Sequence, residues 1–146
     1  MDYSKIIVNT PEDTLKAGFS FAKNLKPGDI VTLDGDLGAG KTVFTKGICE
    51  YFNVTDYVVS PTYTIVNEYK GDIDIFHFDI YRINDEEELY NIGFYEYLDN
   101  DGIKIIEWAK NVPEAFYGYN LIKVEILRDE DLSSQVRTII IKEEKN

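Results

Sequence analysis

The sequence has few cysteines and no long apolar run. Cys49 is the one cysteine among 146 residues, which excludes a disulfide within the chain and favours a reducing compartment. No apolar stretch approaches the ~18 residues that a membrane-spanning helix needs, and the first residues, MDYSK, lack the apolar core of a secretory signal. We therefore expect a cytoplasmic protein that has no contact with a membrane.

Positive charge is also scarce. The chain carries 15 lysines and arginines against 27 acidic residues, which gives a formal net charge of −12. Nucleic-acid binding depends largely on lysine and arginine at the phosphates, and the sequence contains no basic cluster. Direct binding of nucleic acid is therefore not expected. If RNA enters the function of this protein, we expect another subunit to hold it.

The order of the expected elements indicates the fold class. A chain of this length favours a single domain over residues 1–146 with a core of its own. The first half reads as strand, helix, strand, helix, and the second half is rich in hairpins. This predicts an α/β fold, a P-loop NTPase-like domain whose mixed parallel and antiparallel sheet is flanked by helices. The expected strands are 4–10, 30–33, 62–69, 72–81, 103–107, 121–127 and 136–142, and helices are expected to begin after Thr10, the glycine-rich loop and Asp85.

The stretch GDLGAGKT, residues 35–42, is the strongest functional motif. It matches the phosphate-binding pattern G-x-x-x-x-G-K-[ST], and it follows an apolar strand and precedes a helical pattern, as that motif requires. Its glycines permit a close backbone approach to phosphates, its amides form an anion nest, and its lysine reaches the terminal phosphates. The candidate nucleotide-contacting residues are Gly35, Asp36, Leu37, Gly38, Ala39, Gly40, Lys41, Thr42 and Val43.

A phosphate loop also needs an acidic residue at a strand end to complete a magnesium shell. Two strands end on an acid, at Asp79 in IFHFD and at Glu107 in IKIIE. Together with the Thr42 hydroxyl, they are the candidate Mg²⁺ ligands. His77 is the single histidine, and a packed or hydrogen-bonded strand residue explains it better than a metal ligand does.

The motifs leave more than one class of nucleotide-binding protein open. A GTPase usually carries an N-K-x-D signature, and this chain has none. A small-molecule kinase needs cations around the transferred phosphoryl group, whereas the three arginines here, Arg82, Arg128 and Arg137, are scattered along the sequence. A kinase or other phosphotransferase and a nucleotide-gated binding module with negligible turnover remain the alternatives to an ATPase.

Further motifs make the identification more specific. GDLGAGKT, SPTYTIVNEY at 60–69, HFDIYRI at 77–83, EEELYNIGFYEYL and IIEW at 105–108 follow one another at compatible spacing. In this order they resemble the TsaE family, formerly called YjeE, the small bacterial ATPases of tRNA threonylcarbamoyladenosine biosynthesis. The resemblance covers residues 10–108 and is weakest in the C-terminal hairpin.

The resemblance implies roles for individual residues. It implies ATP with Mg²⁺ as the cofactors, with Asp79 near the magnesium and its waters and Glu107 assigned to magnesium binding and hydrolysis. By the same resemblance, catalysis would depend on Lys41, Asp79 and Glu107. Two segments would behave as switches. The first contains Ser60, Pro61, Thr62 and Tyr63, and the second contains His77, Phe78, Tyr81 and Arg82. The resemblance also places Thr10, Pro11 and Arg137 near the nucleotide.

The resemblance also implies partners. A member of this family would not transfer the threonylcarbamoyl group itself but would act on the TsaD–TsaB pair as a nucleotide-driven switch. The acidity of this chain agrees with tRNA being contacted only indirectly, through those partners. We expect slow ATP hydrolysis by the chain alone and faster hydrolysis with the partners present.

Overall fold

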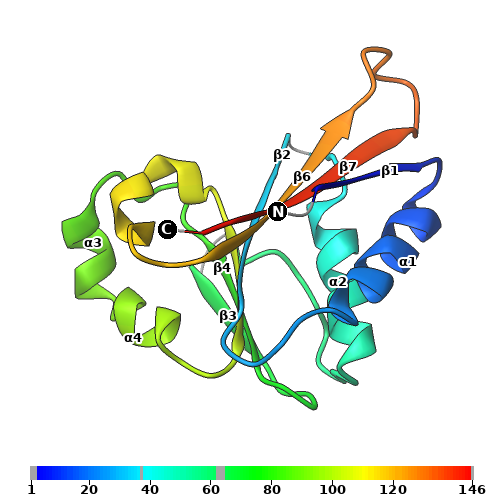
Figure 1. Ribbon diagram of the computed structural model, residues 1–146. Helices are drawn as coiled ribbons and strands as arrows, with labels where there is room; N and C mark the ends of the chain where they lie inside the picture. Colours follow the sequence, from blue (N-terminus) through cyan, green and yellow to red (C-terminus); the bar gives the residue numbers. More distant parts are fainter. Residues whose placement is uncertain (1–2, 37, 62–64, 146) are drawn as a thin grey trace.

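A single mixed sheet forms the centre of the molecule (Figure 1). The computed structural model describes residues 3–36, 38–61 and 65–145. Within these ranges the strands form one seven-stranded sheet in the order β1-β7-β6-β2-β5-β4-β3. The strands are β1 (Tyr3–Val8), β2 (Ile30–Gly35), β3 (Val66–Tyr69), β4 (Ile75–Asp79), β5 (Ile103–Glu107), β6 (Leu121–Arg128) and β7 (Arg137–Glu144).

The direction of the strands confirms the mixed sheet that the sequence predicts. The four central strands, β6, β2, β5 and β4, run parallel to one another. The outer pairs β1–β7, β6–β7 and β3–β4 are antiparallel. Both expected hairpins, β3–β4 and β6–β7, are therefore present. Because the central strands are parallel, their carboxyl ends meet at one edge of the sheet, where ligands bind in open α/β sheets.

Helices cover the two faces of the sheet as separate layers. Figure 1 shows α1 (Pro11–Ala22) and α2 (Lys41–Tyr51) together on one side, and α3 (Glu86–Asn91) with α4 (Phe94–Leu98) on the other. Two short 3₁₀ helices, η1 (Ala109–Asn111) and η2 (Pro113–Phe116), follow β5. Strand β4 shows how the layers divide, because Ile75 packs in the α1–α2 core and the next residue, Phe76, packs in the other core.

Close packing of α1 against α2 fixes the helix that follows the glycine-rich loop. A Cβ atom on Gly18 would lie 2.2 Å from the carbonyl oxygen of Phe44, and one on Gly47 would lie 2.1 Å from that of Leu15. Glycine at both positions therefore lets the two helix backbones touch. The first turn of α2, which carries Lys41, is held by this contact.

Local sequence signals located the starts of two helices correctly. The Thr10 hydroxyl accepts a hydrogen bond from the Asp13 amide and caps α1, with Pro11 at its first position. Asp85 caps α3 in the same way through the Glu88 amide. Helix α4 and the two 3₁₀ helices were not predicted, because segments this short carry too little periodicity. No helix among the described residues is both long and apolar enough to cross a membrane.

Candidate functional site

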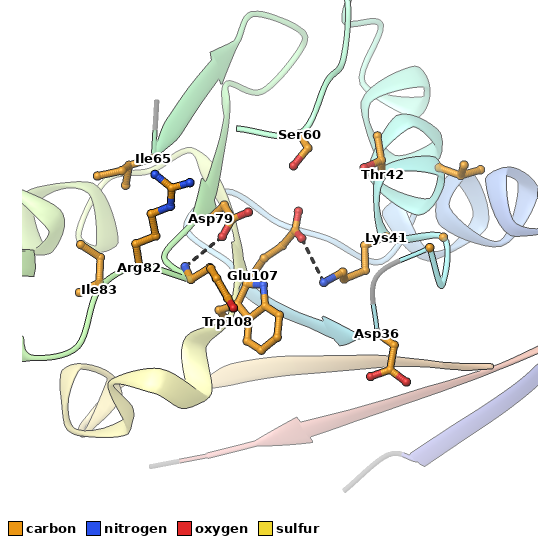
Figure 2. A pocket seen from close by; sticks show the side chains of 14 residues that line it. Asp36, Lys41, Thr42, Ser60, Ile65, Asp79, Arg82, Ile83, Glu107 and Trp108 are labelled. Atoms are coloured by element: carbon orange, nitrogen blue, oxygen red, sulfur yellow. Dashed lines mark hydrogen bonds and ion pairs between the residues drawn. The ribbon is translucent and has the colours of Figure 1, made fainter. Parts of the chain in front are cut away.

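A cleft of about 970 Å³ opens at the carboxyl ends of β2, β4 and β5, beside the first turn of α2. The glycine-rich loop forms one wall, and the segment that follows β4 forms another. Figure 2 shows Lys41 and Glu107 reaching toward each other across this cleft, with Asp79 beside Glu107 and the carboxylate of Asp36 turned away. The cleft therefore brings together the three residues that the sequence analysis named as catalytic.

The glycines of the loop serve two different purposes. Gly38 and Gly40 have φ angles of 78° and 112°, in the left-handed region where a side chain is disfavoured. Gly35 is needed for space instead, because a Cβ atom there would lie 2.7 Å from the carbonyl oxygen of Ile126 on β6. Leu37, another candidate contact, lies outside the described residues.

Lys41 is the first residue of α2, and its ammonium group has two partners. Its Nζ lies 3.4 Å from Oε1 of Glu107 and 5.1 Å from the centroid of the Trp108 ring. The first contact is an ion pair, and the second is a cation–π contact. Because Lys41 is nearly buried, water screens these contacts poorly.

Glu107 ends β5 and uses both carboxylate oxygens. The residue is 4% exposed, and its Oε2 lies 2.6 Å from Nε2 of His77, while Oε1 pairs with Lys41. Burial is the largest single influence and would raise the pKa of this carboxyl, but the hydrogen bond and charge of His77 and the charge of Lys41 together lower it. Glu107 is therefore an anion held between two strands and a helix.

Asp79 is the partner of Glu107 in the register between β4 and β5. Its Oδ1 accepts a hydrogen bond of 3.0 Å from the amide of Tyr81. Burial, together with the negative charge of Glu107, raises the pKa of Asp79, and the Tyr81 hydrogen bond opposes that change. The two neighbouring acids thus have opposite pKa shifts, because Lys41 and the His77 ring pair directly with Glu107.

The donor set at the cleft suits a hard divalent cation that arrives with a nucleotide. Thr42 lines the cleft from α2, and Asp79 and Glu107 line it from the sheet, which supplies the oxygen ligands that Mg²⁺ prefers. Among the described residues, no group of three or more His, Cys, Asp or Glu side chains is arranged to hold a metal alone. Phosphate oxygens would have to complete the coordination shell, as is common for Mg²⁺.

The structure divides the two segments that the resemblance assigns to switches. His77 and Phe78 are fully buried inside β4, whereas Tyr81 and Arg82 follow the strand, are exposed and line the cleft. In the first segment, Ser60 lines the cleft and Pro61 is buried. Thr62 and Tyr63 lie outside the described residues.

Two of the three arginines, which are scattered in the sequence, approach the glycine-rich loop in space, and the third lies elsewhere in the cleft lining. Arg82 lines the cleft. Arg137 donates to the carbonyl oxygens of Ala39 at 3.2 Å and Gly38 at 3.5 Å. Arg128 approaches the same loop, since a Cβ atom on Gly38 would lie 3.8 Å from its Nη1.

A second, smaller hollow adjoins the outer side of the glycine-rich loop. It measures about 240 Å³ and is lined by Pro11, Ala39, Val43 and Arg137, among others. The structure thus brings two of the three residues that the resemblance places near the nucleotide against the loop. The third, Thr10, uses its hydroxyl to cap α1.

Three lining residues were missed as candidates, Ile83, Trp108 and Ile65, and the last two have unusual backbones. Trp108 and Ile65 adopt φ angles of 67° and 68°, which are rare for residues other than glycine. Such conformations concentrate at functional sites. The signal for Trp108 was present in the sequence, because it directly follows Glu107 in the IIEW motif, whereas nothing local marked Ile65.

Comparison with known proteins gives the family. Residues 8–138 match the sequence model of a family described as Threonylcarbamoyl adenosine biosynthesis protein TsaE. The chain is 46% identical over 105 residues to the tRNA threonylcarbamoyladenosine biosynthesis protein TsaE of Bacillus subtilis (strain 168), over 71% of this chain and 65% of that protein. It is 31% identical over 126 residues to the protein of the same name from Treponema pallidum (strain Nichols), over 86% of this chain and 93% of that one.

A solved structure agrees with this match. The fold resembles the crystal structure of Bacillus subtilis YdiB with a TM-score of 0.81 and 33% sequence identity, over 99% of this chain and 87% of that one. The match to the Bacillus TsaE protein spans slightly less than two thirds of that protein's length, at 65%. Because the family's sequence model matches most of the chain, the chain belongs to the TsaE family of threonylcarbamoyladenosine biosynthesis proteins.

Proposed function

We propose that this chain is a Mg²⁺-dependent ATPase that acts on a TsaD–TsaB complex as a nucleotide-driven switch in tRNA threonylcarbamoyladenosine modification. The observation that carries the proposal is the contact between the Lys41 ammonium group and the buried Glu107 carboxylate. It joins the end of a phosphate-binding loop to an acid at the carboxyl end of the neighbouring strand, in a cleft large enough for a nucleotide.

Nucleotide binding would begin with an exchange of partners at Lys41. The triphosphate carries more negative charge than one carboxylate, so Lys41 would leave Glu107 for the β- and γ-phosphates. The amides of the loop would bind the same phosphates at the start of α2. The smaller hollow beside Pro11 and Arg137 offers an apolar and cationic surface for the base or the ribose.

Hydrolysis would use the two acids in different ways. Thr42 and Asp79 would hold Mg²⁺, which neutralises phosphate charge when it is bound. Glu107 would orient the attacking water and accept its proton, because its Oε1 is freed when Lys41 leaves, while the hydrogen bond from His77, which lowers the pKa of Glu107, remains at Oε2. The products are ADP and phosphate.

The exposed side of the cleft is the part that a partner could sense. Tyr81 and Arg82 project from the segment after β4, and Ser60 faces the same cleft from the segment before β3. A γ-phosphate in the cleft would order these segments, and its loss would release them. The net charge of −12 agrees with tRNA being held by the partners.

The proposal is tested by steady-state ATP hydrolysis by the chain alone and with its cognate TsaD–TsaB complex, with Lys41→Ala as the blank. We expect slow turnover alone and clear stimulation by the partners. Equal rates would contradict the partner-dependent switch. ADP formation that depends on a small acceptor molecule would favour a kinase instead, and tight ATP binding without turnover, even with partners, would favour a binding module.

A further inference from the structure

His77 is the middle residue of β4 and lies beneath the cleft. Its ring is 0% exposed, and it does not belong to the lining of the cleft. In the register of β4 with β5, His77 pairs with Ile105, two residues before Asp79 pairs with Glu107. Side chains two residues apart share a face of the sheet, so His77 and Glu107 face the same helix layer.

The contact between His77 and Glu107 has a defined direction. A carboxylate only accepts hydrogen bonds, so the 2.6 Å separation between Nε2 and Oε2 requires that the imidazole carries its proton on Nε2 and donates it. A hydrogen bond this short to an ionised group belongs to the stronger class. The other ring nitrogen, Nδ1, is buried and has no hydrogen-bond partner among the described residues. Within that part of the chain, Glu107 is thus the polar partner of the ring.

A packing role alone does not explain a histidine at this position. The neighbouring residues of the same face, such as Ile75 and Ile105, are apolar and fully buried. Burying a ring nitrogen that lacks a hydrogen-bond partner costs free energy. An apolar side chain would fill the space of His77 without that cost. The hydrogen bond to Glu107 is the contact that an apolar side chain would lose.

The two partners of Glu107 differ in their freedom to move. His77 is fixed in a central strand that is hydrogen-bonded on both sides, to β3 and β5. Lys41 reaches Glu107 with a long side chain from the first turn of α2 and lines the cleft itself. A ligand in the cleft can therefore remove Lys41 from Oε1 without disturbing the hydrogen bond at Oε2.

We propose that His77 is a positioning residue for hydrolysis, which holds Oε2 of Glu107 so that Oε1 faces the cleft after Lys41 has moved to the nucleotide. The inference rests on the proposed ATPase function, and it predicts a specific division of effects. His77 is not among the residues that line the cleft, and its hydrogen bond in the described part of the chain is to Glu107, so nucleotide affinity should not depend on it. The rate of the hydrolytic step should depend on it, because Glu107 would lose its fixed orientation.

The test uses the matched pair His77→Gln and His77→Asn in the full chain with its partners. Both variants bury an amide, but the longer glutamine places its N–H near the position of Nε2, and asparagine does not. We expect His77→Asn to lower kcat by about 10- to 100-fold, as loss of a supporting hydrogen bond commonly does, with the ATP dissociation constant changed less than twofold. His77→Gln should recover most of the lost kcat. Equal kcat values for the two variants, or a parallel loss of ATP affinity in both, would overturn the proposal.

A double-mutant cycle then tests whether His77 acts through Glu107. In a Glu107→Gln background, His77→Asn should have little further effect on kcat, because the carboxylate that it positions is already gone. Additive losses would show that His77 acts by another route. Thermal unfolding of each variant separates loss of folded protein from loss of rate.

The imidazole itself provides a readout that does not depend on activity. Because His77 is the single histidine of the chain, ¹⁵N NMR of a histidine-labelled sample reports its tautomer without assignment. In the wild type we expect the proton on Nε2, and in Glu107→Gln we expect a large shift of the Nε2 resonance. The opposite tautomer would overturn the proposal even if the chain is an active ATPase. Failure of the wild type to hydrolyse ATP in a Lys41-dependent way would instead remove the proposed function, and the inference with it.

Discussion

The two ends of β5 each hold a buried charge, and the charges are satisfied in different ways. At the amino end, Lys104 is 0% exposed, and its ammonium group donates to the carbonyl oxygens of Gly28, at 3.2 Å, and Asn100. At the carboxyl end, Glu107 is paired with the side chains of Lys41 and His77. Both residues belong to the short segment IKIIE.

The difference lies in what the partners can do. The partners of Lys104 are backbone carbonyl groups, which cannot move away as a side chain can. The ammonium group of Lys104 therefore links the loop at Gly28 to the loop at Asn100. One partner of Glu107 is a long side chain that can exchange this carboxylate for a phosphate group. A buried charge with fixed backbone partners therefore points to a structural role, whereas a buried charge with an exchangeable partner points to a functional one.

The largest expected effect concerns the exchangeable partner. Lys41→Ala removes the cation that would bind the phosphates, and we expect kcat/KM for ATP hydrolysis to fall by ~10³-fold or more. The measurement is ADP release in the presence of Mg²⁺ and the partner proteins. Lys46→Ala is the matched control, because Lys46 lies on the same helix and its ammonium group is 6.0 Å from the Tyr57 ring, outside the cleft. Loss of activity in Lys46→Ala would contradict the assignment.

The next effect concerns the charge at the carboxyl end itself. Glu107→Gln should lower kcat by about 10²-fold, because an amide cannot accept the proton of water. ATP affinity should stay equal or rise, since Lys41 no longer has a competing anion. Isothermal titration calorimetry beside the rate assay measures both quantities. A variant that hydrolyses ATP at the wild-type rate would show that Glu107 is not the base.

The smallest effect on activity is expected for Lys104, near the amino end of β5. Lys104→Met leaves two carbonyl oxygens without their donor, and we expect the free energy of unfolding at pH 7 to fall by about 1–3 kcal/mol. ATP hydrolysis should be unchanged, because Lys104 lies at the opposite edge of the sheet. Urea unfolding measures the stability and the rate assay measures the activity, and a large loss of kcat in a folded variant would contradict a purely structural role for Lys104.

Lys104 should also leave a signature in the pH dependence of stability. Burial lowers the pKa of Lys104, although Asp101, Asp29 and Asp99 oppose the change. Between this lowered pKa and the ordinary lysine value, the unfolded chain binds more protons than the folded one. The free energy of unfolding of the wild type should therefore rise with pH in this window relative to Lys104→Met. Parallel pH profiles of the two proteins would contradict this.

Much of this arrangement could be predicted from local sequence. The phosphate loop is defined by glycines with fixed roles, the helix start at Thr10 by capping chemistry, and Asp79 and Glu107 by their places after apolar strands. The strand that ends on Glu107 was identified as buried, which the structure confirms. These features depend on a few neighbouring residues, so the local pattern contains the information.

The pairings across the sheet could not be predicted in the same way. The contact of His77 with Glu107 depends on the register of two strands 30 residues apart. The approach of Arg137 to the loop depends on where the C-terminal hairpin adds to the sheet, which the sequence positions of the arginines do not reveal. The left-handed backbone of Trp108 is imposed by its tertiary surroundings, because its own side chain disfavours that conformation.

If ATP replaces Glu107 as the partner of Lys41, the single tryptophan of the chain should report the exchange. Trp108 lies 5.1 Å from Nζ of Lys41, and 5.0 Å from Nζ of Lys110 outside the cleft lining. We therefore propose titration of ATP with Mg²⁺ while Trp108 fluorescence is recorded. We expect a saturable change in fluorescence in the wild type and in Lys110→Ala, and no such change in Lys41→Ala. Unchanged fluorescence in a wild-type sample that calorimetry shows to be saturated with ATP would contradict it.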